Sequence, residues 1–172
     1  MKVTFRVLIS VVILFIVTWF SPLYGNDNTP DSVVKKYYQA DLDGARLSAE
    51  GYRKIKPLIL WEHEPGWDLV FVTKGARIDK TGQLRTGEIY VTVFYEVLGI
   101  LTGDELLEIE FTQVVTFNLI KKNGQWKIKQ PVIFPHVSQL ALSKHMEDVL
   151  KENQDKKREA RLNLIIKRLR EL

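Results

Sequence analysis

The chain has 172 residues, of which 45% are hydrophobic and 27% charged, and it carries a net charge of +4 without any cysteine. These values suit one globular core domain with some length left for appendages. The lack of cysteine excludes disulfides, thiol nucleophiles, cysteine-based zinc sites and a lipid-modified cysteine. The positive excess lies in the first residues and in the C-terminal tail, so nothing favours nucleic-acid binding.

The first 25 residues have the pattern of a secretory signal peptide. Lys2 and Arg6 precede a largely apolar run over residues 7–20, and Gly25 follows before a polar stretch. The run is shorter than the roughly 20 residues of a spanning helix, so cleavage after Gly25 is expected, with a retained inner-membrane anchor as the alternative. In both cases the remainder is expected outside the cytoplasm, in the periplasm or secreted, because the positive flank stays inside.

Two helical segments are expected after this leader. Residues 29–32 (Thr-Pro-Asp-Ser) are typical of a helix start, and Asp43-Gly44 is typical of a helix end. Between them an apolar face recurs at helical spacing and consists of Val33, Val34, Tyr37, Tyr38 and Leu42. A second helical region over residues 48–61 is interrupted by Pro57, which predicts two pieces or a kink.

The loop over residues 61–68 holds two tryptophans, three acidic residues and one histidine. In one interpretation it is the rim of a pocket, where Trp61, His63 and Trp67 contact a ligand. In the other it is a structural clamp, in which the two tryptophans bury a large area where the helices meet the sheet. No metal is expected, because neighbours in sequence on a turn rarely converge on one ion.

Four antiparallel strands are expected next. Alternating apolar residues predict strands over residues 69–78, 88–101, 106–120 and 126–134. The first is expected to end at an Asp-Lys-Thr-Gly turn at 79–82, and Asn123-Gly124 predicts a tight hairpin between the last two. Gln113 and Gln130 interrupt otherwise apolar faces of that hairpin. They either bond to each other across it or contact a ligand.

The tail from residue 138 is expected to be helical. Ser138 is a candidate cap for a helix over residues 139–151. After a polar stretch comes a basic amphipathic helix whose apolar positions are Leu162, Ile165, Ile166, Leu169 and Leu172. This face either binds a partner helix or a membrane surface, or folds back on its own domain. His136 and His145 are expected at the surface.

Residues 30–40 and the Lys-Asn-Gly-Gln-Trp-Lys-Ile stretch at 122–128 resemble the first helix and the last hairpin of NTF2-like (SnoaL-like) domains. The resemblance spans residues 30–137. It implies an α+β fold in which N-terminal helices pack on a curved antiparallel sheet of about four strands that encloses a conical cavity. It also implies a possible homodimer through the sheet. Candidate polar residues lining the cone are Tyr38, Tyr52, Gln113 and Gln130.

No nucleophile-elbow, zinc-protease, phosphate-loop or dinucleotide motif occurs. The sequence therefore predicts a leader (1–25), an NTF2-like domain (30–137) and a helical extension (138–172). The expected function is a non-catalytic module, without a cofactor, that binds a small apolar ligand or a protein partner. One alternative is an anchored subunit of a cell-envelope assembly, since the layout resembles the inner-membrane assembly subunit of type IV secretion channels. The other is an isomerase or dehydratase that uses a carboxylate, a tyrosine or His63 as base.

Overall fold

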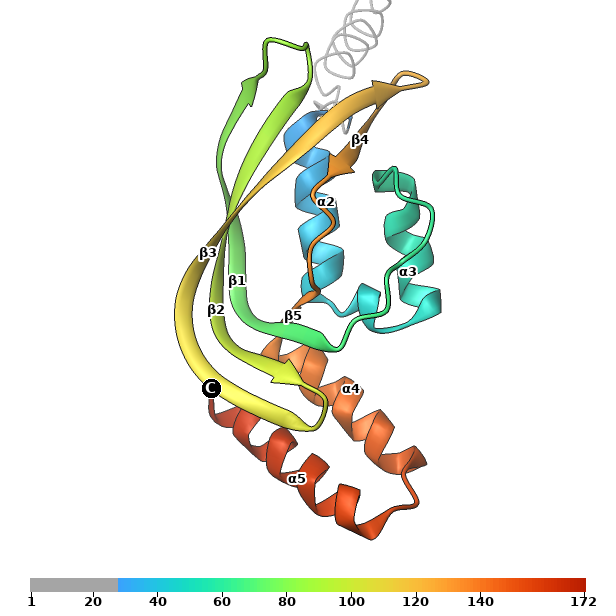
Figure 1. Cartoon of the computed structure of the whole chain (residues 1–172), viewed down its shortest axis with the longest axis vertical. Helices are drawn as coiled ribbons and strands as arrows, with labels where there is room; N and C mark the ends of the chain where they lie inside the picture. Colours follow the sequence, from blue (N-terminus) through green and yellow to red (C-terminus); the bar gives the residue numbers. More distant parts are fainter. Residues whose placement is uncertain (1–27) are drawn as a thin grey trace, which may run out of the picture.

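The computed structural model describes residues 28–172, so the predicted leader lies outside the described residues. The fold is α+β, as expected: a curled sheet with helices on its inner face and beneath its lower end (Figure 1). The helices are α2 (Pro30–Leu42), α3 (Ala49–Ile55), α4 (Gln139–Glu152) and α5 (Lys156–Glu171), with the 3-10 turns η1 (Ala45–Leu47) and η2 (Lys56–Leu58). The strands are β1 (Leu69–Gln83), β2 (Ile89–Thr102), β3 (Glu105–Lys122), β4 (Gln125–Gln130) and β5 (His136–Ser138).

The sheet is mixed and has the order β4-β3-β2-β1-β5. The expectation of about four strands, all antiparallel, is wrong in one respect, because β5 pairs with β1 in parallel. After β4 the chain returns across the inner face to the far edge of the sheet. There His136–Ser138 lies beside Phe71–Thr73. A parallel neighbour needs such a crossover, and a three-residue strand leaves too little alternation to be read from sequence.

The predicted hairpin forms between β3 and β4. Asn123 and Gly124 both have positive φ, 52° and 77°, as a tight type I′ turn requires. The return strand is shorter than expected and ends at Gln130, because Pro131 has no N–H to continue the ladder. The register places Gln130 opposite Asn118, and Gln113 lies opposite Tyr95 on β2. The predicted bond between the two glutamines is therefore wrong.

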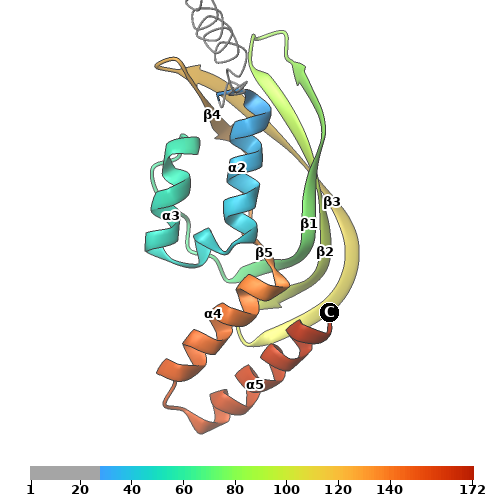
Figure 2. The same cartoon turned by 180° about the vertical axis from the view of Figure 1, so that it is seen from behind.

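Helix α2 begins and ends as the sequence predicts. Thr29 and Ser32 form a reciprocal capping box, and the chain leaves the helix through Gly44 at a positive φ of 81°. Its buried face is laid against the concave side of the sheet (Figure 2). Pro57 divides the second helical region into α3 and η2, also as expected.

Strand β1 continues past its predicted end. Thr81, Gly82 and Gln83 pair with β2, and the turn falls at residues 84–88 instead. Residues 79–82 have turn composition, but the long partner strand offers them a ladder of backbone hydrogen bonds, and this pairing outweighs the local preference.

Strand β3 has one residue more than β1 and β2 where the sheet curls. The stretch from Val72 to Gly75 on β1 and its partner stretch from Gly99 to Glu96 on β2 each advance three residues, with two register shifts that offset each other. The matching stretch of β3 runs from Glu108 to Thr112 and advances four. Strand β3 therefore contains one extra residue here, which is the effect of a β-bulge that bends a sheet.

Helices α4 and α5 form a layer under the lower end of the sheet (Figure 1). The apolar face of α5 is buried there, and Ile165 and Leu169 share a second core with Val72, Leu106 and Leu142. Leu162 and Ile166 are buried as well. In this structure α5 therefore folds back on its own domain and does not present its apolar face to a partner helix or a membrane.

Ion pairs flank this contact between α5 and the rest of the chain. Arg168 pairs with Glu108 at 2.6 Å, and Arg170 pairs with Glu147 at 2.6 Å. The basic side chains of α5 thus face acidic partners on β3 and α4. No helix within residues 28–172 is long and apolar enough to cross a membrane.

Candidate functional site

A pocket of about 580 Å³ lies where α3, the loop over residues 64–68, the ends of β1 and β2, and α4 meet. This volume falls in the usual range of small-molecule sites. Its walls are mainly apolar and include Leu47, Tyr52, Trp67, Val70, Leu101, Leu142 and Met146. Because α4 provides one wall, the pocket needs both the predicted domain and its helical extension.

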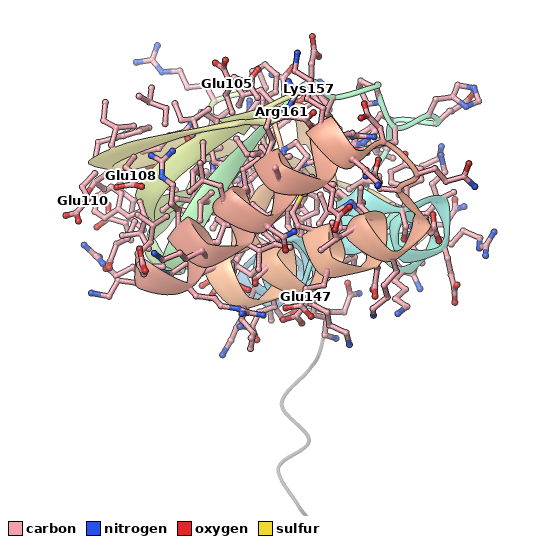
Figure 3. The ribbon with its side chains drawn as sticks, turned by 90° about the horizontal axis from the view of Figure 1, so that it is seen from below. Glu105, Glu108, Glu110, Glu147, Lys157 and Arg161 are labelled. Carbon is pink, nitrogen blue, oxygen red and sulfur yellow. The ribbon has the colours of Figure 1, made fainter. Side chains whose placement is uncertain are left out.

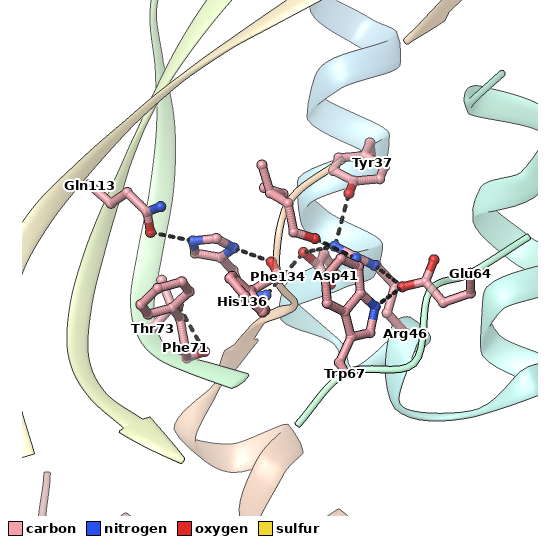
Figure 4. A network of polar contacts seen from close by, with 11 residues as sticks. Tyr37, Asp41, Arg46, Glu64, Trp67, Phe71, Thr73, Gln113, Phe134 and His136 are labelled. Carbon is pink, nitrogen blue, oxygen red and sulfur yellow. Dashed lines mark hydrogen bonds and ion pairs between the residues drawn. The ribbon is translucent and has the colours of Figure 1, made fainter. Parts of the chain in front are cut away.

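Arg46 lines the pocket and forms its polar floor, and Figure 4 shows the network of contacts around it. Its side chain is fully buried, and Nε donates to Glu64 Oε1 at 2.7 Å. Nη2 donates to the carbonyl of Ile133 at 2.6 Å, and Nη1 donates to Tyr37 Oη at 3.0 Å. The guanidinium also stacks over Trp67, 5.0 Å from the ring centroid. With the contact of Nη1 to Asp41, four of the five N–H donors of the guanidinium are therefore committed to the protein.

Asp41 lies behind this floor and is fully buried. Its Oδ2 is 3.4 Å from Arg46 Nη1 and accepts from the amide of His136 at 3.1 Å. Burial raises the pKa of this carboxyl to about 7, against the lowering effects of the Arg46 charge and of the His136 amide. The nearby Glu64 also raises it, because a second negative charge disfavours the ionised form of Asp41.

His136 is fully buried, so its predicted surface position is wrong. It stacks on Phe71, with ring centroids 4.9 Å apart, and tilts against Tyr95 at 4.1 Å. Nδ1 is 2.9 Å from the carbonyl of Phe134 and must carry the proton, because a carbonyl only accepts. Burial, helped by the Arg46 charge, lowers the pKa of the ring to about 3 against the raising effect of the hydrogen bond to the Phe134 carbonyl. Nε2 faces the side-chain amide of Gln113 at 2.8 Å.

The structure separates the residues that the sequence proposed as ligand-binding. Tyr52 and Trp67 line the pocket, and the Trp67 indole donates to Glu64. Trp61 packs edge-on against Tyr37, and Tyr38 belongs to the core. The remaining three do not line it: His63 and Gln130 are exposed, and Gln113 is held by His136.

Sequence reasoning missed Asp41 and Arg46. One signal for Asp41 is present, because it falls on the same helical face as Val34, Tyr37 and Tyr38. A carboxylate in that position needs a buried partner. The partner, Arg46, is five residues away across a turn, a spacing that no local pattern marks.

The titrations of the buried Asp41 carboxyl and of the buried His136 ring have opposite effects on the pH dependence of stability. Asp41 has a folded-state pKa above its unfolded value of about 4, so its contribution is present at acidic pH and is lost as the pH rises from about 4 to about 7. His136 has a folded-state pKa below its unfolded value of about 6.5. Its contribution is present above that value and is lost as the pH falls toward about 3. Between about pH 4 and 6.5 the two slopes cancel.

We therefore expect that Asp41→Asn makes the stability depend on pH. The free energy of unfolding should rise by about 1.4 kcal/mol per pH unit between about pH 4 and 6, since only the His136 effect remains. Urea unfolding at stepped pH measures this slope. In the control His136→Gln the free energy of unfolding should instead fall as the pH rises over the same range. An Asp41→Asn profile parallel to that of the wild type would contradict the raised pKa of Asp41.

Comparison of the chain with protein-family models, with curated proteins and with solved structures found no match. Within residues 28–172, no group of three or more acidic or histidine side chains is placed to hold a metal ion. The pocket and its buried floor are therefore the features on which a function is argued.

Proposed function

We propose that this chain is a non-catalytic NTF2-like module that binds a small, largely apolar ligand in the pocket between α3, the 64–68 loop and α4. The observation that carries the proposal is the pocket itself. It combines aromatic and aliphatic walls with a polar floor whose hydrogen bonds are already made within the protein. Such a floor favours a ligand that offers apolar surface and few charges, because most of the N–H donors of the Arg46 guanidinium are already bonded within the protein.

A binding role is favoured over catalysis by the position of the titratable groups. Asp41, Tyr95 and His136 are fully buried and do not line the pocket. A general base must come within hydrogen-bond reach of the proton that it removes. Of the groups within residues 28–172 whose pKa is shifted, Arg46 and Tyr52 line the pocket; Arg46 is bonded to Glu64, and the Tyr52 hydroxyl donates to the carbonyl of Trp61.

The NTF2-like part of the proposal is supported by the order of the elements. Helices α2 and α3 precede a curled sheet, and α2 lies on its concave side. The proposal also places the module outside the cytoplasm, which rests on the leader pattern of residues 1–25 alone. The mass of the mature chain is the deciding measurement: a start at Asn26 supports export with cleavage, and an intact chain in the cytosol contradicts it.

Filling the pocket is expected to abolish ligand binding. Met146→Trp places a larger side chain in the wall, so binding of the neutral apolar dye N-phenyl-1-naphthylamine should weaken by about tenfold or more. Dye fluorescence measured against protein concentration gives the affinity. The matched control is Leu140→Trp, on the same helix but outside this pocket and 82% exposed.

The outcome depends on the comparison of the two variants. Retained binding by Leu140→Trp together with its loss in Met146→Trp supports the proposal. Equal dye binding by both variants, with circular dichroism spectra like the wild type, would place the dye elsewhere and refute the pocket as the binding site.

A further inference from the structure

The lower half of β3 is an open edge of the sheet. Strand β4 pairs only with Asn118–Lys122, so residues 105–117 have β2 on one side and no described strand on the other. Figure 1 shows this part of β3 at the outer margin of the curl, with β4 only beside its upper end. An open edge presents a row of backbone N–H and C=O groups that another strand can pair with.

This edge carries an apolar stripe. All six residues from 107 to 112 are exposed. The alternate positions Leu107, Ile109 and Phe111 are 57%, 45% and 38% exposed. Leu106 points into the second core, so the three face the opposite, concave side, where Phe111 meets Phe71 with ring centroids 6.1 Å apart. Open edges are usually protected by charges on the apolar side, and between residues 107 and 112 that side has none.

The other face of the same stretch is acidic. Glu108 and Glu110 alternate with the apolar stripe and therefore lie on the opposite face. Figure 3 shows Glu108 and Glu110 at the free margin of the sheet. Glu108 pairs with Arg168 but remains about half exposed. Glu110 forms no ion pair with any residue in the range 28–172. The edge therefore has an apolar side and a negatively charged side.

The apolar side and the acidic side together indicate which kind of strand can pair with this edge of β3. A second copy paired antiparallel through the middle of this stretch would bring the glutamates of both chains close together, and like charges across neighbouring strands destabilise a sheet. A strand that alternates apolar with basic residues would instead cover the apolar stripe on one face and neutralise Glu110 on the other. We propose that residues 105–117 of β3 bind an extended segment of a partner protein, with alternating apolar and basic residues, as an added strand.

Designed peptides test this inference on the full chain. A labelled peptide of about nine residues that alternates valine and lysine is compared with its valine–glutamate counterpart and with a lysine version that has a central proline. Fluorescence anisotropy should show binding of the lysine peptide about tenfold tighter than binding of the other two. Amide hydrogen exchange should slow in residues 105–117, because only strand addition gives these groups new hydrogen bonds.

Variants at exposed positions identify the surface. Glu108→Lys with Glu110→Lys should reverse the preference toward the glutamate peptide, and Ile109→Glu should weaken binding of the lysine peptide. The control Leu140→Glu, on α4, should leave it unchanged. Equal affinity for both charges, no protection of residues 105–117, or no binding at all would overturn the inference. Protection of these residues by self-association without peptide would assign the edge to a second copy, which also overturns it.

Discussion

Arg46→Met is expected to lower the free energy of unfolding by about 3–5 kcal/mol. The substitution keeps an unbranched chain in the core but leaves Asp41 buried without its cation, and Glu64 loses the same partner. It also removes the donor that holds the carbonyl of Ile133. Urea unfolding followed by tryptophan fluorescence measures the loss.

The double variant Asp41→Asn with Arg46→Met is the control for this expectation. Removal of both charges takes away the unpaired carboxylate, so the double variant should be more stable than Arg46→Met alone. A loss below about 1 kcal/mol in the single variant would show that Arg46 contributes no more than an exposed pair, contrary to its full burial.

Leu169→Ala is expected to destabilise the protein by about 2–5 kcal/mol. Leu169 is fully buried on α5 and belongs to the core that α4 and α5 share with the sheet. Removing its side chain leaves a cavity between α5 and the lower sheet. The midpoint and slope of urea unfolding give the change, and a single transition would show that α5 unfolds together with the sheet.

Leu164 provides the matched control on the same helix. It is 55% exposed, so Leu164→Ala should change stability by less than about 0.5 kcal/mol. Similar effects of the two substitutions would contradict the docking of α5 through its apolar face. The ion pairs of Arg168 and Arg170 add a smaller effect, which salt should weaken because both side chains are partly exposed.

The sequence predicted those parts of the fold that depend on neighbouring residues. The helix start at Thr29, the break at Pro57 and the Asn123-Gly124 turn each depend on a few neighbouring residues, and all three were predicted correctly. The Asp79–Gly82 turn failed because pairing with a distant strand outweighed local composition. Strand β5 was missed for the same reason, since its partner lies more than sixty residues earlier.

The candidate site was less accessible to sequence reasoning. Trp67 was identified because tryptophans beside a turn suggest a pocket rim or a clamp, and Tyr52 was a candidate as a polar residue lining the expected cone. His136 was misplaced because a histidine beside a proline suggests a surface position. Its burial depends on Phe71 and Gln113, which reach it from β1 and β3. A buried polar network is defined by several segments together, so no single stretch contains its signal.

The extra residue of β3 at the curl has a mechanical consequence. Between the same flanking pairs β1 and β2 each advance three residues and β3 advances four, so the bend depends on the residue count of β3. Substitutions within 108–111 keep that count and should preserve the bend. Deletion of one residue there would shorten β3 and rotate the lower sheet, together with the α4–α5 layer, against the upper half.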